Sequence, residues 1–457
     1  MTQWLLVGKR WILLLPALLA VTTLSAASVT AWEPRFRGDL STPTAIIWIF
    51  VSTVAIAPAV LFMLAGLARS FTRPPAAPSQ PAREPVTRFV VIVPAYNEEK
   101  VISNSVGSLL AQDYPRELFT VTVACNGWDG TANIARELGA QVHETRQKGI
   151  GKSAAIDETM QALAPAPQSY VVIFDADNLV SRGFLRSLDA EIQASGALAL
   201  QGNHQPLTAS DNMVSVGIRA AYRASSMFYS VGRSFLLRSA LLCGTGFSVQ
   251  AGLFASIWSK VRTQTEDIES NALLQLDHQL GVVWVEAAEF FDEKPDQVVI
   301  AIRQRVRWMV GHFHASQLYT WPLIKHAFRH RSLRSLELAV YYLFPLALFL
   351  STAWYLLALP AMAVGLGHFH PEAVAMTVAG TALGLVYIVA MPALACLLEQ
   401  RSLRPRALAI TLRETLAALL ISLLVWSIAI LLAAACLRRR DWIFHTPHKA
   451  AVPLPRP

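Results

Sequence analysis

The sequence has few charged residues for its length. Only 15% of its 457 residues are Asp, Glu, Lys or Arg, whereas 54% are hydrophobic. A soluble globular chain carries about 25% charged residues, so this composition argues against an ordinary soluble protein and points to the membrane. The formal net charge of +8 suits anionic lipid headgroups and anionic substrates.

The sequence also lacks two other signatures. No run of basic residues is interleaved with aromatic residues, which disfavours nucleic acid as a partner. The chain has no CxxC pair, and its few cysteines lie far apart, which argues against a disulfide framework or a zinc site and suggests a reducing compartment or burial. These cysteines are Cys125, Cys243, Cys396 and Cys436.

Long uncharged runs occur near the beginning of the chain. Trp11–Ala31 and Ser41–Ala68 are each long enough to cross a bilayer, so residues 1–68 are predicted to form two transmembrane helices. A signal peptide is the alternative for the first run. Residues 69–88 form a proline-rich linker, and the arginines in it place the following region in the cytoplasm by the positive-inside rule.

The chain becomes apolar again after residue 311. Residues 312–335 are expected to form an amphipathic helix on the membrane surface. Residues 336–437 contain about three predicted spans, Leu338–Leu366, Ala373–Leu398 and Thr415–Leu437, before a basic tail at 438–457. Three crossings would put the C-terminus outside, yet Arg438–Arg440 argues for the inside. Either one segment does not fully cross, or one contains two crossings.

The region between the apolar ends, residues 89–311, alternates short β-rich runs with helical runs. Strands are expected at Phe89–Val93, Phe119–Ala124, Gln141–His143 and Tyr170–Phe174, and helices at Ser103–Gln112, Thr131–Leu138 and Lys152–Leu163. This alternation predicts a parallel sheet with ligand binding at its carboxyl edge.

Two aspartates follow a buried apolar stretch in Val171-Val-Ile-Phe-Asp-Ala-Asp-Asn178. Asp175 and Asp177 are therefore expected at the carboxyl end of a strand, where open α/β sheets bind ligands. Alternation along an extended chain sends both side chains to one side, and two carboxylates held so close favour a cation between them. A divalent metal on a diphosphate would meet that need. The alternative is a strand-to-turn junction with Asp as a turn residue.

Further loops are expected at the same edge. Val91–Glu99 is predicted to form strand, turn and helix start, with Tyr96 placed to stack on a base. Glycines in Asn126–Thr131 permit a tight turn near a ligand, and Asp129 is expected to cap the next helix.

A lysine begins a predicted helix in Lys148-Gly-Ile-Gly-Lys152. The spacing is not that of a phosphate-binding P-loop, so Lys152 either contacts a phosphate or is solvated.

Three motifs lie in the second half of the domain. Cys243–Phe247 is a loop of small residues that lets a ligand approach the backbone. Thr265-Glu-Asp267 precedes a helical run with Thr265 as the expected cap; carboxylates are stabilised at a helix start, and an ionised Asp267 is also suited to accept a proton from a hydroxyl. Gln304-Arg-Val-Arg-Trp308 ends the domain and, taken alone, is explained by interfacial anchoring.

Taken in order, PAYNEE, DADN, GTGF, TED and QxxRW resemble the motif set of membrane-embedded family 2 glycosyltransferases, the group of cellulose, hyaluronan, chitin and poly-N-acetylglucosamine synthases. The resemblance extends by motif from Val91 to Trp308, and the flanking apolar runs match by layout. It implies an α/β GT-A fold, that of nucleotide-diphospho-sugar transferases, embedded between transmembrane helices. The motifs are specific for the superfamily and not for one product.

The resemblance implies a role for each matched residue. Asp175 would contact the nucleotide sugar, Asp177 would bind Mg2+ or Mn2+ on the diphosphate, and Asp267 would be the general base. The other matched positions are expected to bind substrate, with QxxRW on the diphosphate and acceptor sugar and GTGF lining the acceptor site: Tyr96, Glu98, Asn126, Lys152, Gly244, Thr245, Glu266, Gln304, Arg307 and Trp308.

The function implied is inverting transfer from a nucleotide sugar to a growing polysaccharide, with processive export through the protein's own spans. The catalytic domain would be cytoplasmic on a multi-pass inner or plasma membrane, with an accessory export subunit left open. One alternative is a non-processive transferase that glycosylates a membrane lipid. Another is a membrane scaffold or transporter subunit with an inactive domain, against which the intact motifs argue.

One position departs from the family pattern. Family members commonly have an aspartate at the end of the second strand that contacts uracil, and this chain has Cys125-Asn126 there. An amide offers both a donor and an acceptor to a base, so the expected preference for a UDP-linked sugar is less strongly specified here.

Overall fold

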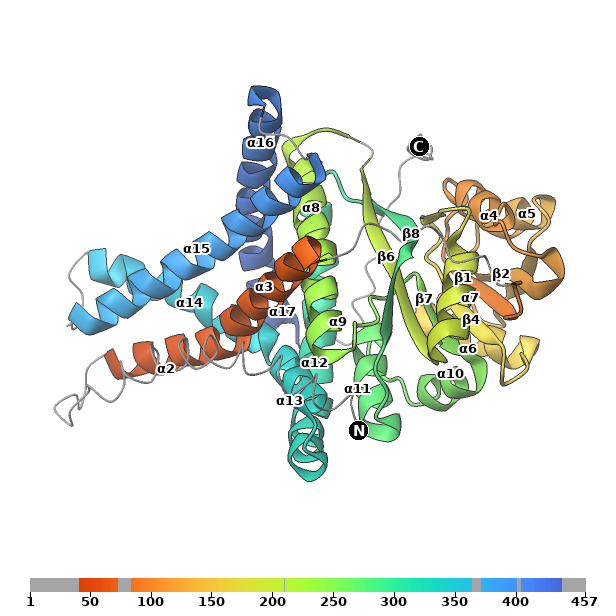
Figure 1. Cartoon of the computed structure of the whole chain (residues 1–457), viewed down its shortest axis with the longest axis horizontal. Helices are drawn as coiled ribbons and strands as arrows, with labels where there is room; N and C mark the ends of the chain where they lie inside the picture. Colours follow the sequence, from red (N-terminus) through yellow and green to blue (C-terminus); the bar gives the residue numbers. More distant parts are fainter. Residues whose placement is uncertain (1–40, 73–83, 209, 364–370, 401–403, 438–457) are drawn as a thin grey trace.

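The computed structural model describes residues 41–72, 84–208, 210–363, 371–400 and 404–437. A sheet domain lies at one end of the molecule and long helices lie at the other, with a layer of helices between them (Figure 1). The first expected span at 11–31, most of the proline-rich linker and the basic tail at 438–457 lie outside the described residues.

One eight-stranded sheet forms the core of the domain, in the order β3-β2-β1-β4-β7-β6-β8-β5. The first four strands pair in parallel, as do β6 and β8. β7 runs antiparallel to both β4 and β6, and β5 runs antiparallel to β8. The strands are Phe89–Ala95 (β1), Phe119–Cys125 (β2), Gln141–Glu144 (β3), Tyr170–Ile173 (β4), Leu179–Val180 (β5), Ala199–Thr208 (β6), Phe247–Gln250 (β7) and Val283–Lys294 (β8).

The sequence predicts the first half of this sheet closely, because β1 to β4 are short apolar runs between helices. The expected all-parallel sheet is wrong for the second half, where β5 and β7 run antiparallel. β6 and β8 were not expected, since polar residues such as Gln201, Asn203 and Asp292 interrupt their apolar alternation. The result is a mixed GT-A-like sheet.

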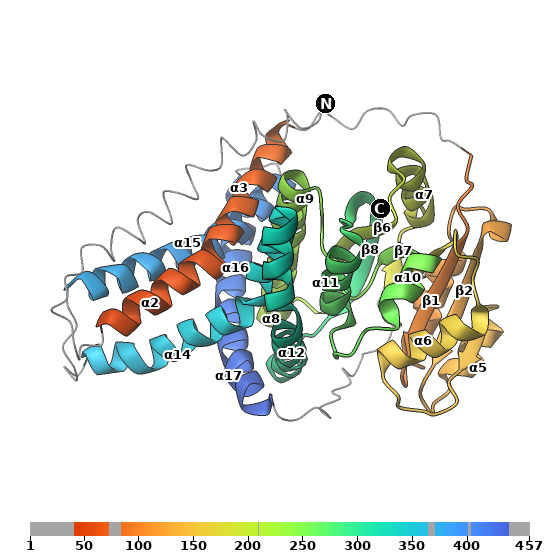
Figure 2. The ribbon, with the colours of Figure 1, turned by 90° about the horizontal axis from the view of Figure 1, so that it is seen from below.

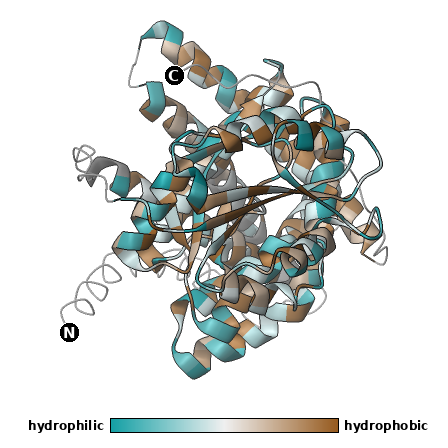
Figure 3. Ribbon diagram, turned by 90° about the vertical axis from the view of Figure 1, so that its right-hand side faces the viewer, coloured by the Kyte–Doolittle hydropathy of each residue, from teal (hydrophilic) through white to brown (hydrophobic). Residues whose placement is uncertain are grey.

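Helices cover both faces of the sheet. Successive residues of β1 alternate between the two cores, so that Val91 and Val93 join one and Ile92 the other. Figure 3 shows apolar strands running between helices with largely hydrophilic outward faces. One face packs against α4 (Ile102–Leu110), α5 (Thr131–Glu137) and α7 (Phe184–Ser195), the other against α6 (Lys152–Leu163), α10 (Ala251–Trp258) and α11 (Glu266–His278), and a 3-10 turn (Arg116–Leu118) precedes β2.

A layer of helices separates the sheet domain from the apolar helices (Figure 2). It contains α8 (Met213–Ala224), η3 (Ser225–Ser230), α9 (Val231–Leu237), α12 (Val298–His330) and α13 (Leu333–Tyr342). The helix expected at 312–335 is the second half of α12, which already begins at Val298, so the Gln304–Trp308 motif lies within a helix.

The apolar helices extend away from this layer. By length and composition alone, two helices among the described residues suffice to cross a membrane, Ile46–Arg69 and Pro405–Cys436. The pair Leu333–Tyr342 and Phe344–Leu357, bent by 40°, makes a third if the two helices are counted as one span. The elements are α2 (Ser41–Val51), η1 (Ser52–Ile56), α3 (Ala57–Thr72), α14 (Phe344–Ala363), α15 (Pro371–Gln400), α16 (Pro405–Ile421), η4 (Ser422–Trp426) and α17 (Ser427–Cys436).

Candidate active site

The Asp-Ala-Asp-Asn turn follows β4 and is fastened to the loop before β7. The backbone N–H of Asp175 donates to Asn178 Oδ1 at 3.1 Å and to Thr245 Oγ1 at 2.9 Å, and the Thr245 hydroxyl also bonds to Asn178. Asn178 and Thr245 are buried. Because β4 and β7 are neighbours, the sheet itself brings these two motifs together.

Lys152 connects three motifs that are far apart in the sequence. Its Nζ lies 2.7 Å from Asp175 Oδ1 and 3.0 Å from Glu266 Oε1, and it donates to the carbonyl oxygen of Gly244 at 2.7 Å. Burial alone would lower the pKa of Lys152, but Asp175 and Glu266 raise it, so the ammonium stays charged. Lys152 is therefore a three-way link and not a solvated side chain.

Asp267 lies next to this network. Gly244 lies beside the Asp267 carboxylate, since a Cβ at position 244 would be 3.4 Å from Asp267 Oδ2. Because Gly244 has no side chain, it does not cover the carboxylate on that side. Burial raises the pKa of Asp267 to about 7, and the Glu266 carboxylate adds to the rise, while the backbone N–H of Ile268 and the Lys152 ammonium oppose it. A carboxylate whose pKa lies near neutrality is well matched to proton removal at physiological pH.

A second carboxylate holds the start of α11 in place. Glu269 is fully buried and accepts from the backbone N–H groups of Arg262 and Thr263, both at 2.7 Å, and from the Tyr319 hydroxyl at 2.6 Å. Thr265 is the N-cap residue of α11, as expected, but its buried hydroxyl makes no capping hydrogen bond. Its side chain instead packs against Gly311 of α12, which fixes the distance between α11 and α12.

The β1 and β2 loops form a second cluster at the same edge. Trp128 N donates to Asn97 Oδ1 at 2.9 Å, and Glu98 N donates to Thr131 Oγ1 at 2.9 Å. Tyr96 and Trp128 meet edge to face with ring centroids 5.8 Å apart. Asp129 accepts from Thr131 N at 3.1 Å, but the N-cap position of α5 is Gly130, one residue later than the expected cap.

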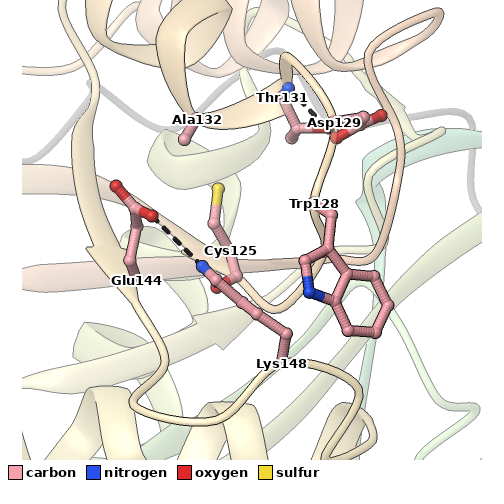
Figure 4. A pocket seen from close by; sticks show the side chains of 8 residues that line it. Cys125, Trp128, Asp129, Thr131, Ala132, Glu144 and Lys148 are labelled. Atoms are coloured by element: carbon pink, nitrogen blue, oxygen red, sulfur yellow. Dashed lines mark hydrogen bonds and ion pairs between the residues drawn. The ribbon is translucent and has the colours of Figure 1, made fainter.

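The side-chain oxygen of Asn126 accepts hydrogen bonds within the protein. It is 3% exposed, and its Oδ1 accepts from the Thr145 hydroxyl at 3.3 Å and from Ile150 N at 3.1 Å. This oxygen is therefore already an acceptor within the protein, and the predicted contact with a base would have to share it. Beside it, a cavity of about 220 Å³ opens among Cys125, Gly127, Trp128, Asp129, Thr131, Ala132, Glu144 and Lys148 (Figure 4).

At the end of β2, where the family commonly has an aspartate, this cavity is lined by Cys125. In Figure 4 the Lys148 ammonium reaches across to Glu144, at 3.1 Å, and the Cys125 thiol faces the same space. Burial raises the pKa of Cys125 to about 11, so the thiol is neutral. The cavity is thus lined by an ammonium, two carboxylates and a thiol.

The Gln304–Trp308 motif lies on the first half of α12, in the layer next to the apolar helices. Trp308 packs against the cluster that α12 forms with α17, and Gln304 Oε1 lies 3.5 Å from Arg305 Nη1. These contacts tie both residues to the helix layer and not to the Lys152 network. Arg307 is half-buried on the same stretch.

Several buried polar residues of the site were not expected. Gln201, fully buried on β6, accepts from Cys243 N at 2.9 Å and donates to the Thr245 carbonyl at 3.0 Å, so it supports the Gly244–Thr245 loop from both sides. Only Asn178 had a sequence signal, as the last residue of Asp-Ala-Asp-Asn.

A buried His204–Asp292–Lys294 cluster was also not expected. His204 Nε2 lies 2.9 Å from Asp292 Oδ2, which also pairs with Lys294. Burial alone would lower the pKa of Lys294, but Asp292 and, more weakly, Asp177 raise it. No local pattern links residues so far apart in the sequence.

The residues at the β4 edge suit a hard divalent cation in part. Asp175 and Asp177 supply carboxylate oxygens, the donor type that Mg2+ prefers. No group of three or more His, Cys, Asp or Glu side chains able to hold a metal occurs in the described part of the chain, so a cation here would need further oxygens from a ligand. A metal that bridges protein carboxylates to a diphosphate has this kind of coordination.

Comparison with known proteins identifies the domain that carries these motifs. Residues 85–311 match the family described as "Glycosyltransferase like family 2". The chain contains a glycosyltransferase family 2 domain. This match and the mixed sheet confirm the glycosyltransferase class and the GT-A fold that the motifs predicted.

The glycosyltransferase domain has curated relatives. It is similar to the probable glycosyltransferase YdaM of Bacillus subtilis, with 23% identity over 48% of this chain and 54% of YdaM. It is also similar to cellulose synthase 2 of Novacetimonas hansenii, with 27% identity over 48% of this chain and 14% of that protein. The chain thus matches about half the length of YdaM and much less of the synthase.

Solved structures include a distant likeness. The mannosyltransferase PcManGT from Pyrobaculum calidifontis, in complex with GDP-Man and Mn2+, is 20% identical, covers 83% of this chain and 98% of that one, and superposes with a TM-score of 0.47.

Proposed function

We propose that this protein is an inverting membrane glycosyltransferase that transfers a sugar from a nucleotide sugar to an acceptor hydroxyl. The observation that carries the proposal is the Lys152 link, which brings Asp175, Glu266 and Gly244 within hydrogen-bond distance of one ammonium. This link gathers the proposed donor, base and acceptor motifs at one sheet edge. A structural role alone would not require three functional motifs to converge there.

In the proposed mechanism Asp267 is the general base. It removes the proton of the acceptor hydroxyl as the oxygen attacks the anomeric carbon, on the face opposite the diphosphate. Because the attack displaces the diphosphate directly, one base suffices and the anomeric configuration inverts. Gly244 and Thr245 line the acceptor side, and Gln304, Arg307 and Trp308 bind the diphosphate and the acceptor sugar.

Asp177 is the proposed protein ligand of Mg2+ or Mn2+, and Asp175 the contact to the nucleotide sugar. When bound, the metal would neutralise charge on the diphosphate leaving group. Tyr96, Glu98 and the Cys125–Lys148 cavity form the proposed nucleoside side. UDP is the proposed nucleotide, although Asn126 is occupied internally and discrimination would fall to Cys125, Glu144 and Lys148.

A growing polysaccharide is the proposed acceptor, with export through the membrane helices. The similarity to a cellulose synthase supports this choice, as does the place of Trp308 between the sheet domain and α17. The rival acceptor is a membrane lipid, which would enter the same site from the bilayer.

The test supplies membranes that contain the protein with radiolabelled UDP- and GDP-sugars and sizes the product. Incorporation into high-mass polymer supports the polysaccharide, and label in an organic-extractable lipid would replace it with the rival. Asp177→Ala is expected to abolish metal-dependent incorporation. Absence of turnover with every nucleotide sugar of the panel would contradict the proposed activity.

A further inference from the structure

The helix Pro405–Cys436, named here the C-terminal helix, combines α16, η4 and α17. With 32 residues it is roughly 48 Å long at 1.5 Å per residue, more than the hydrocarbon core of a bilayer of about 30 Å. Its length and composition fit a membrane span. Its contacts point to a different placement.

The first part of the C-terminal helix is bound to α8 of the helix layer, and to the segment just before it, by ion pairs. Arg413 Nη1 lies 2.7 Å from Asp211 Oδ2, and Glu414 Oε2 lies 2.6 Å from Arg223 Nη1. Asp211 and Arg223 belong to the segment that leaves β6 and forms α8. Glu414 is 4% exposed, so its charge is compensated by α8 and not by water.

The middle of the helix continues along the same surface. Gly217 of α8 has no side chain where the backbone of Ala417 passes, and a Cβ there would clash with the Ala417 carbonyl. Further on, Ile421 and Val425 pack with Ile218 of α8 and Ala301 of α12. The helix therefore stays in van der Waals contact with elements that emerge directly from β6 and β8.

The far end of the helix also touches the catalytic domain's own helix. The Arg305 guanidinium lies 5.4 Å from the Trp426 ring and 5.5 Å from the Trp308 ring, and His314 Nε2 lies 3.1 Å from the Leu437 carbonyl oxygen. α17 packs on Val306, Met309 and Val310, which surround the Gln304–Trp308 motif. The C-terminal helix therefore contacts α8 or α12 from its first part to its far end, and its far end also packs against Leu348 and Phe349 of α14.

The opposite face of the C-terminal helix is apolar and exposed over its whole length. Large aliphatic side chains recur at intervals of four residues, each between 36% and 60% exposed: Leu408, Leu412, Leu416, Leu420, Leu424, Ile428 and Leu432. In both Figure 1 and Figure 2 this helix runs crosswise to α3, α14 and α15, at the end of these helices that is nearer to the sheet domain.

We propose that the C-terminal helix does not cross the membrane but lies in its cytoplasmic surface, with the aliphatic face in the lipid and the opposite face under α8 and α12. The partner of that face is the acyl region below the headgroups of the cytoplasmic leaflet, the depth at which amphipathic helices bind. In this placement the C-terminal helix packs between the lipid and α12 and holds the Gln304–Trp308 motif at the membrane surface.

This placement also resolves the conflict in the charge pattern. If α14 and the 30-residue helix α15 cross once outward and once inward, as the apolar runs Leu338–Leu366 and Ala373–Leu398 predict, the chain returns to the cytoplasm before Arg404. The basic Arg438–Arg440 then falls on the same side as the catalytic domain, as the positive-inside rule requires.

The test measures depth in the bilayer along the helix. Single nitroxide-labelled cysteines are placed at Leu408, Leu416, Leu424 and Leu432 of the full chain, with the native cysteines replaced, and oxygen and aqueous nickel accessibility are measured in vesicles. The proposal predicts a similar shallow depth at all positions. A profile deepest at the middle and shallow at both ends would overturn it, as would labels shielded from both probes by a second protein copy, or labels open to water.

A second measurement needs no substitution in the C-terminal helix. Reporters that are active only on one side of the membrane are fused after the C-terminal residue and, separately, within residues 364–370. The proposal predicts that the C-terminal reporter is on the cytoplasmic side and the 364–370 reporter on the other. A C-terminal reporter on the outer side would contradict it. Neither readout involves sugar transfer, so failure here is separate from failure of the proposed activity.

Discussion

Two regions of this molecule, the carboxyl edge of the sheet and the contact between the helix layer and the C-terminal helix, are held together by different kinds of interaction. At the carboxyl edge of the sheet, short hydrogen bonds and ion pairs centred on Lys152 join loops that come from different strands. Where the C-terminal helix meets the helix layer, apolar packing between α12 and α17 dominates, with ion pairs at the α16 end. Substitutions at the edge should therefore change catalysis, whereas those in the layer should change stability and membrane placement.

The largest effect is expected for Asp267→Asn. The amide keeps the size of the side chain but accepts no proton, and loss of a general base typically costs a factor of about 10² to 10⁴ in rate. Sugar transfer at saturating donor measures it. Asp277→Asn, near the end of the same helix and paired with the surface residue Lys260, is the matched control and should transfer sugar like the native chain. Near-native transfer by Asp267→Asn would rule out the assigned base.

Lys152→Met should reduce transfer by a smaller factor, roughly 10², because Asp175 and Glu266 lose the charge that holds them together. Lys152→Arg should recover part of the rate. The double variant Lys152→Met with Glu266→Gln should be better than the product of the two single effects, since it removes a buried unpaired carboxylate. Strict additivity would show that Lys152 acts apart from Glu266. Lys260→Met, an exposed lysine, is the control.

In the helix layer, Glu414→Gln should leave the chemistry intact and lower stability by roughly 1.5–3 kcal/mol, the value of a hydrogen bond to a charged group. Glu414 is buried against Arg223. The midpoint of thermal unfolding in detergent measures the change, with sugar transfer below that midpoint as the second readout. A fall in sugar transfer without a fall in the unfolding midpoint would contradict the expectation that this contact affects stability and not catalysis.

The smallest effect is expected for Asp211→Asn. Its partner Arg413 is 46% exposed and Asp211 is 66% exposed, and pairs of this kind contribute about 0–1 kcal/mol. The unfolding midpoint should barely move. A shift as large as that of Glu414→Gln would show that the outer ion pair carries the docking of the C-terminal helix.

The sequence predicts the parts of the fold that are local. β1 to β4 and α6 follow from apolar runs between turn residues, and Asp175, Gly244 and Glu266 from their motifs. β6 and β8 escape prediction because their polar residues, such as Gln201 and His204, are satisfied only by distant partners. The same holds for the contacts of Lys152, whose partners lie after β4, before β7 and at the start of α11. It also holds for Asn126, whose side-chain oxygen accepts from Ile150 N.

The orientation of the C-terminal helix is a further case. Hydropathy predicts a membrane span over Pro405–Cys436. The packing of this helix on α8 and α12, on which the proposed surface placement rests, depends on residues distant in the sequence.

The pH dependence of sugar transfer tests the central claim most directly. A base is active when deprotonated, and the pKa of Asp267 is raised to about 7. The rate at limiting donor should therefore rise with pH by one log unit per pH unit below about 7 and level off above it, and Asp267→Asn should lose that rise. A wild-type rate that does not change between about pH 5 and 8 would contradict the assignment of Asp267 as the base. An unchanged rise of the rate with pH in Asp267→Asn would contradict it as well.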